Sequence, residues 1–260
     1  MKLTIRSISL AAFVLAATIY CSTSAGNFQQ VMNLIDEKSD LLSQHHFFNF
    51  MANKSIPADK RLQFMPYWTF FSMGASDILD NWIRVQNPQT ELEHRINAFI
   101  AEDNWHYNFF IHDMDNILKY TISDFGSYGA ILRHIWGDES RAVRMLVYTT
   151  AEVTRSKDPL VTLASFEAME SGLNFLFDSI YDNIFKEEEE FENMQYFGAM
   201  HIDLERSHTI TGDVLGNYNA SEETIQLSQE IIEEIFYWYV NKVLWNNTLI
   251  ILVHMGVVHI

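Results

Sequence analysis

The sequence predicts an all-α protein, and three observations support that prediction. Glycine and proline are scarce, with 10 and 4 residues respectively, which favours long helices over a fold of many strands and turns. Hydrophobic residues make up 48% of the 260 residues, which is enough for a sizeable core. These residues recur at spacings of three and four, the period of an amphipathic helix. No repeat or linker divides the chain, so we expect one helical domain over residues 27–247, built from about seven helices.

Residues 1–26 have the order of a secretory signal peptide. Lys2 and Arg6 precede an apolar run over 8–20, and small residues follow as far as Gly26. The run is too short for a comfortable membrane span. With this segment cleaved, the protein is secreted or periplasmic. The alternative is an uncleaved amphipathic helix on a cytoplasmic protein.

The first half of the mature chain predicts three helices. Apolar residues at helical spacing place the first over 27–52. The second, over 58–86, is apolar nearly all round and is therefore expected to be central. Thr90 and Glu93 form a capping-box pattern, which predicts the start of a third helix over 90–120.

The second half predicts further helices, separated by glycine, proline and charged runs. Their ranges are 128–137, 138–156, 158–186, a helix after the four glutamates of 187–190, and 221–245. Asp158-Pro159 is a typical helix start. The tail, 248–260, is apolar but too short to be a spanning helix, so we expect no stable membrane span.

Charge and cysteine content exclude several classes of protein. The net charge of −17 disfavours nucleic-acid binding, which needs a basic face. The single cysteine, Cys21, lies in the signal-like segment, so an intrachain disulfide and a thiolate zinc cluster are excluded. A homodimer is left open.

The segment from His201 to His208 is the most informative stretch. In a helix, His201, Glu205 and His208 lie within about 60° of one another on one face. The neighbouring residues are largely apolar, so this face is expected to point into the core. A buried carboxylate is costly unless its charge is compensated. A metal ion compensates it, and imidazole with carboxylate suits iron, manganese or zinc.

Two other predicted helices contain acidic residues in apolar surroundings. Asp103 and Glu102 precede His106 by three and four residues, so either can share a helix face with it. Glu167 and Glu170 are three residues apart on a later helix. Helical bundles build di-iron and di-manganese sites from Glu-x-x-His steps and single carboxylates on facing helices. Such a set of imidazoles and carboxylates fits two irons better than one zinc.

The order of these motifs resembles the heme-oxygenase-like di-iron oxidases, relatives of heme oxygenase and thiaminase II. In that family a carboxylate–His helix comes first, a Glu helix follows, and a helix with His-x3-Asp/Glu-x2-His comes last. The resemblance covers about residues 30–245 and implies a single seven-helix heme-oxygenase-like bundle. The metal ligands that it implies are Glu102 or Asp103 with His106, Glu167 or Glu170, and His201, Glu205 and His208. Phe99 stands where some members have a further Glu, which leaves that coordination position open.

The resemblance also implies an activity. Members are oxidases or oxygenases in which reduced iron activates dioxygen, and they act on small organic substrates such as amino acids and fatty acids. We therefore expect two iron ions per chain, with manganese as an alternative because the same ligands accommodate it. The substrate would lie in a cavity between the helices. The aromatic residues expected in its wall are Tyr67, Trp68, Phe70 and Phe71.

Three other interpretations compete with this one. A heme protein would use His45 or His46, but the acidity of the chain opposes binding of heme propionates. Heme binding would also give no role to the polar helix face at 201–208. A ferritin-like carboxylate protein explains the two x-x-His steps but not His201. A non-enzymatic helical binding protein would use Glu205 in a structural hydrogen-bond network.

Overall fold

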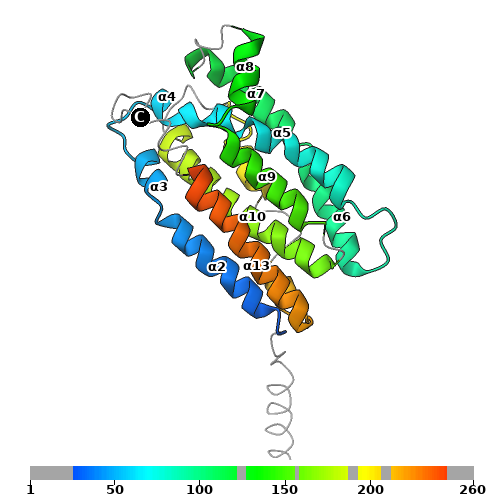
Figure 1. The fold of residues 1–260 in the computed structure, drawn as a ribbon. Coiled ribbons are helices and arrows are strands. Elements are labelled where there is room, and N and C mark those ends of the chain that lie inside the picture. The colour runs from blue at the N-terminus through cyan, green and yellow to red at the C-terminus, as the bar shows by residue number, and fades with distance from the viewer. Residues whose placement is uncertain (1–25, 122–126, 156–157, 187–192, 206–211, 245–260) are drawn as a thin grey trace, which may run out of the picture.

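In a computed structural model of the chain, all regular secondary structure of the described residues is helical (Figure 1). The described residues are 26–121, 127–155, 158–186, 193–205 and 212–244, and these contain no β-strand. The prediction of an all-α protein is confirmed. The signal-like segment, the apolar tail, the four-glutamate run and His208 lie outside the described residues, apart from Gly26.

The centre of the bundle is α10 (Pro159–Ile180), a helix of 22 residues with apolar residues buried along most of its length. It packs against α2 (Gln29–Ser43) and α13 (Glu222–Trp238), and the three run side by side in Figure 1. On another side, α9 (Arg141–Val153) packs against α13. The predicted start of α10 is confirmed, because the Asp158 carboxylate accepts a hydrogen bond from the Leu160 N–H at 3.0 Å.

The predicted first helix, 27–52, is two helices. It divides into α2 and α3 (His46–Met51) because His45 adopts an extended conformation, with ψ at 138°. The His45 side chain caps α3 by accepting a hydrogen bond from the Phe47 N–H at 3.2 Å. His45 therefore has a structural role as a helix cap.

The predicted second helix, 58–86, changes its winding three times. It consists of α4 (Ala58–Arg61), the 3₁₀ helix η1 (Leu62–Trp68), α5 (Thr69–Ile78) and the π-helix η2 (Leu79–Ile83). Pro66 lies inside η1, where its missing N–H and fixed ring are incompatible with a regular α-helix interior. This segment is largely buried, as expected, but α10 rather than this segment is the central helix.

The predicted third helix, 90–120, breaks where the candidate site lies. The capping box is confirmed: Thr90 Oγ1 accepts from the Glu93 N–H, and Glu93 accepts from the Thr90 N–H. The helix α6 (Glu91–Asp103) then ends, a turn covers 104–106, and α7 (Tyr107–Thr121) begins. His106 therefore lies in a turn between two helices.

The remaining elements complete the bundle and lengthen its helices. They are α8 (Tyr128–Trp136), η3 (Tyr181–Phe185), α11 (Ala199–Glu205), α12 (Gly212–Leu215) and η5 (Tyr239–Leu244). Because predicted helices are broken, the described part of the chain has more than seven separate helices, and the heme-oxygenase-like arrangement stays a prediction. No described helix is both long and apolar enough to span a bilayer.

Candidate metal centre

Five of the predicted ligands meet between α6, α10 and α11. Asp103 ends α6, His106 lies in the following turn, and Glu170 comes from the middle of α10. His201 and Glu205 lie one helical turn apart on α11. Both histidines and Glu205 are buried, with at most 6% of each residue exposed, whereas Asp103 and Glu170 are partly buried.

Three donor atoms form a small triangle at the centre of this group. Oε1 of Glu205 lies 2.7 Å from Nε2 of His201 and 3.0 Å from Nδ1 of His106. The two imidazole nitrogens are 3.0 Å apart. Two ligands bound at right angles, each about 2.1 Å from one cation, are separated by about 3.0 Å. The triangle therefore fits neighbouring ligands of a single divalent ion, and its two imidazoles and one carboxylate are a set that iron accepts.

A second group of donors adjoins the first. One carboxylate oxygen each from Asp103, Glu170 and Glu205 lie within 4.8 Å of one another. Glu205 belongs to both groups, so its carboxylate lies between a nitrogen-rich set of donors and an all-oxygen set. The donors present thus fit one cation or two, with Glu205 as the shared ligand.

The charge on His106 depends on its two carboxylate neighbours. Burial alone would lower the pKa of His106, but hydrogen bonds and charge attraction from Asp103 and Glu205 outweigh burial and raise the pKa to about 9. Nδ1 of His106 lies 2.8 Å from Oδ1 of Asp103. In metal-free protein at neutral pH, a proton on this nitrogen therefore supplies the positive charge between the carboxylates.

Aromatic rings surround both histidines. The His201 ring stacks on Tyr196, with centroids 4.8 Å apart and planes 22° apart, and meets Phe177 edge-on at 4.9 Å. The His106 ring stacks on Phe109 at 5.7 Å. These rings give the imidazoles an apolar surrounding and fix the planes of their rings.

The five residues are part of the lining of a largely apolar cavity. It has about 80 Å³ of space for the centres of water-sized molecules, which is room for several waters or a small ligand. Its apolar lining comes mainly from α5, η2, α6 and α10 and includes Phe71, Leu79, Ile83, Phe99, Phe166 and Leu173.

Of the predicted cavity wall, the structure places one aromatic residue at the cavity. Phe71 lines it, whereas Tyr67, Trp68 and Phe70 are not among its lining residues. The Tyr67 hydroxyl donates to Glu139, at 3.4 Å, and the Trp68 ring packs against Phe71 and Tyr239.

A second, more polar cavity is lined by two of these carboxylates, those of Glu170 and Glu205. It has about 270 Å³ of space for water-sized molecules and is lined by one stripe of α10 together with Glu205 and two phenylalanines. The polar residues of the stripe are Glu167, Glu170, Ser171 and Asn174. The candidate centre therefore lies between an apolar cavity and a polar one.

Two of the remaining predicted ligands, Glu102 and Glu167, are not members of the two donor groups. Glu102 is partly buried near the end of α6 and belongs to neither group. Glu167 also belongs to neither, although it lines the polar cavity. His208 lies outside the described residues, and the rival heme ligands His45 and His46 line neither cavity.

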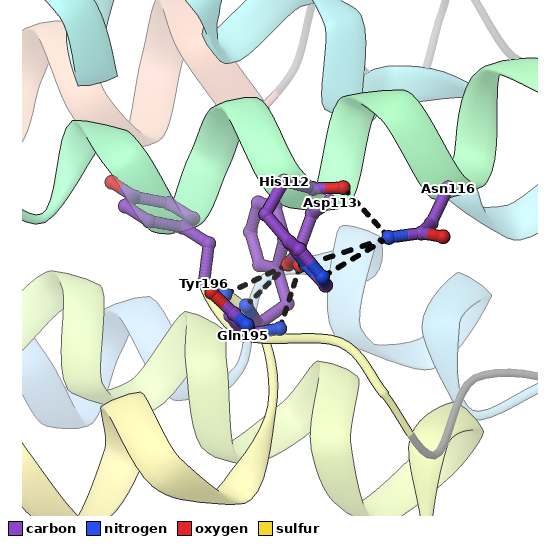
Figure 2. Close-up of polar contacts among 6 residues, drawn as sticks. His112, Asp113, Asn116, Gln195 and Tyr196 are labelled. Carbon is purple, nitrogen blue, oxygen red and sulfur yellow. Dashed lines mark hydrogen bonds and ion pairs between the residues drawn. The ribbon is translucent and has the colours of Figure 1, made fainter.

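The sequence left open whether Asp113 supports the metal ligands or lies at the surface, and the structure shows it completely buried on α7. Its carboxylate accepts hydrogen bonds from the backbone N–H groups of Gln195, Tyr196 and Phe197, at 2.6, 2.8 and 3.1 Å (Figure 2). Burial raises the pKa of Asp113, and these N–H donors act in the opposite direction. In the sequence, Asp113 follows Phe110 by three residues, which places it on the apolar face of the helix and indicates that it is buried.

Comparison with known proteins gives no family: no family model matches the chain, and no curated protein matches it.

Proposed function

We propose that this chain is a non-heme iron oxidoreductase that uses dioxygen to oxidise a small organic substrate held between its helices. The observation that carries the proposal is the convergence of His106, His201 and Glu205 on one buried point beside an apolar cavity. Buried ionisable groups of this kind in a pocket are typical of functional sites. The proposal agrees with the resemblance to heme-oxygenase-like di-iron oxidases that the sequence motifs indicate.

The donor groups suggest how two ions would be held. His106, His201 and Glu205 would bind one ion, and Asp103, Glu170 and Glu205 would bind the other. Iron is the proposed metal and manganese the alternative, because both accept mixed imidazole and carboxylate ligands. When bound, reduced iron supplies the electrons that dioxygen needs before it can oxidise an organic molecule.

The residues of the chain have separate tasks in this proposal. The apolar cavity binds the hydrocarbon part of the substrate and excludes water, with Phe71 and Leu173 in its wall. A cation that binds at Nδ1 of His106 must displace the proton held there, so acid opposes metal binding. Amino acids and fatty acids remain the proposed substrate classes.

One competing function has a specific observation in its favour. Protonated His106 is already satisfied by Asp103 and Glu205, so the cluster is also compatible with a structural hydrogen-bond network in a ferritin-like, heme-oxygenase-like or non-enzymatic binding protein without oxidase activity. A non-enzymatic binding protein would take up no metal at the cluster, so direct loading with iron separates it from the oxidase. A ferritin-like protein would also take up iron, and it would differ from the oxidase in leaving a small organic substrate unoxidised.

The test is anaerobic loading with ferrous iron, followed by oxygen uptake and an absorbance scan as oxygen is admitted. The proposal predicts two irons retained per chain, rapid oxygen consumption and a transient visible band. His201→Ala should lose iron, whereas His45→Ala, a matched change at a helix cap, should retain it. A wild-type chain that retains no iron would contradict the proposal.

A further inference from the structure

We propose that Asp113 is a positioning residue for the metal centre. It would fix the backbone of residues 195–197, and through it the Tyr196 ring that stacks on His201. This inference rests on the proposed function, because it concerns the same centre. Asp113 itself belongs to neither donor group. It would act on the centre only through the backbone and rings that it fixes.

The first step is that Asp113 forms hydrogen bonds with a segment distant in the sequence. Figure 2 shows its side chain pointing from α7 toward the chain at Gln195 and Tyr196, and its partners are 82 to 84 residues away in sequence. Hydrogen bonds from N–H groups to a carboxylate are stronger and shorter than neutral ones. One side chain therefore fixes three consecutive peptide N–H groups relative to α7. An asparagine of the same size offers one acceptor oxygen instead of two.

The second step is that the position of α11 depends on these hydrogen bonds. The described part of this helix begins at Ala199, two residues after Phe197, and covers seven residues. A helix of this length is not stable by itself, so its place is set by packing and by the segments that anchor its ends. The Asp113 contacts anchor the segment that leads into its N-terminus. Because α11 contributes both His201 and Glu205, a shift of this segment would move two of the proposed ligands together.

The third step concerns the orientation of the His201 ring. A metal-ligating imidazole usually donates its second N–H to an acceptor, which fixes the ring. Nδ1 of His201 is buried and has no hydrogen-bond partner among the described residues. The plane of this ring is instead fixed by stacking on Tyr196 and by the edge of Phe177. Asp113 accepts a hydrogen bond from the N–H of that same Tyr196, so it controls the residue that orients His201.

Asp158 provides a matched control for this argument. Its carboxylate also joins two parts of the fold, because it caps α10 at the Leu160 N–H and accepts from the Thr224 hydroxyl at 2.7 Å. It lies twelve residues before Glu170, about 18 Å along α10 from the centre. Loss of either carboxylate should weaken the fold. Only loss of Asp113 should alter metal binding.

The experiment uses Co²⁺ as a probe, because its visible absorption reports the geometry of its ligands. For the wild-type chain, Asp113→Asn and Asp158→Asn, we would measure the dissociation constant for Co²⁺, the absorption spectrum and the urea midpoint. We expect Asp113→Asn to weaken Co²⁺ binding by about 10- to 100-fold, the usual effect of losing an orienting partner, and to change the spectrum. Asp158→Asn should lower the urea midpoint but keep the wild-type affinity and spectrum. Wild-type affinity and spectrum in Asp113→Asn would overturn the inference.

Two further variants test the inference if Asp113→Asn does not fold. Tyr196→Leu removes the stacked ring, and Tyr196→Phe retains it. We expect weaker Co²⁺ binding in the leucine variant and wild-type binding in the phenylalanine variant, and equal binding in both would overturn the inference. A wild-type chain that binds no Co²⁺ would instead refute the proposed function on which the inference rests.

Discussion

Replacement of Glu170 by glutamine should stabilise the metal-free chain and weaken its response to metal. An oxygen of Glu170 lies within 4.8 Å of oxygens from Asp103 and Glu205. Three ionised carboxylates this close repel one another, and in metal-free protein the proton on His106 offsets part of that repulsion. Functional sites commonly reduce stability in this way, so a gain on neutralisation is expected of a cation site.

The size of the effect follows from the spacing. At 4.8 Å and an effective dielectric constant of about 20, one pair of like charges costs about 3.5 kcal/mol. Glu170 makes two such pairs, and attraction to His106 offsets roughly one of them. Since Asp103 and Glu170 are partly exposed, we halve the remainder for solvent screening, which leaves about 2 kcal/mol. For a domain of this size, that gain raises the melting temperature by about 4–8 °C.

Glu167→Gln is the matched control. Glu167 lies one turn earlier on the same helix, is also partly buried, and belongs to neither donor group. The same chemical change there should alter the free energy of unfolding by less than about 0.5 kcal/mol. It should also leave the response to metal unchanged, which separates the two glutamates that the sequence offered as ligands.

The assay is thermal unfolding followed by circular dichroism, first with a chelator and then with Mn²⁺. At a concentration about 100 times the dissociation constant, bound metal should stabilise the wild-type chain by about 2.7 kcal/mol. Glu170→Gln should melt higher than wild type with the chelator and gain less from Mn²⁺. The reasoning is refuted if Glu170→Gln melts at or below the wild-type temperature without metal, or gains as much from Mn²⁺.

The remaining predictions concern the fold. Burial, with a smaller contribution from His46, lowers the pKa of His45 from 6.5 to about 4, so its stabilising contribution is complete above pH 6.5 and is lost as the pH falls toward 4. His45→Asn keeps a capping acceptor without this titration, so the wild-type chain should lose more stability than the variant between pH 7 and about 4.5; parallel pH profiles in urea unfolding would contradict this. Gly172→Ala should destabilise the chain by about 1–3 kcal/mol, because the added Cβ would lie 2.8 Å from the Tyr239 ring. Gly129→Ala, in α8 with its nearest neighbour at 3.5 Å, should instead stabilise by about 0.5–1 kcal/mol; chemical denaturation that gave both changes the same sign would contradict this packing.

The parts of the fold that depend on local chemistry could be predicted. The capping box at Thr90 and the cap at Asp158 involve residues a few positions apart, so their patterns are visible in the sequence. The breaks at His45 and at 104–106 contain no proline or glycine to mark them. The pairing of Asp103 with His106 was nevertheless predictable, because a tight turn keeps residues three apart nearly as close as a helix does.

The types of residue in the candidate site could be predicted, but which of the candidate residues meet there could not. His201 and Glu205 follow from helical spacing, since they are one turn apart on the same element. The choice of Glu170 over Glu167 depends on how α10 is rotated against α6 and α11, which only tertiary packing decides. The role of Asp113 could not be predicted because its partners are backbone N–H groups, which leave no pattern in a sequence.

The most direct test of the metal centre is an anomalous difference map from crystals grown with Mn²⁺. The account predicts a manganese peak within bonding distance of His106 Nδ1, His201 Nε2 and Glu205 Oε1. It predicts a second peak among the carboxylates of Asp103, Glu170 and Glu205. A map without a peak at this cluster, or with manganese bound only elsewhere on the chain, would contradict the central claim.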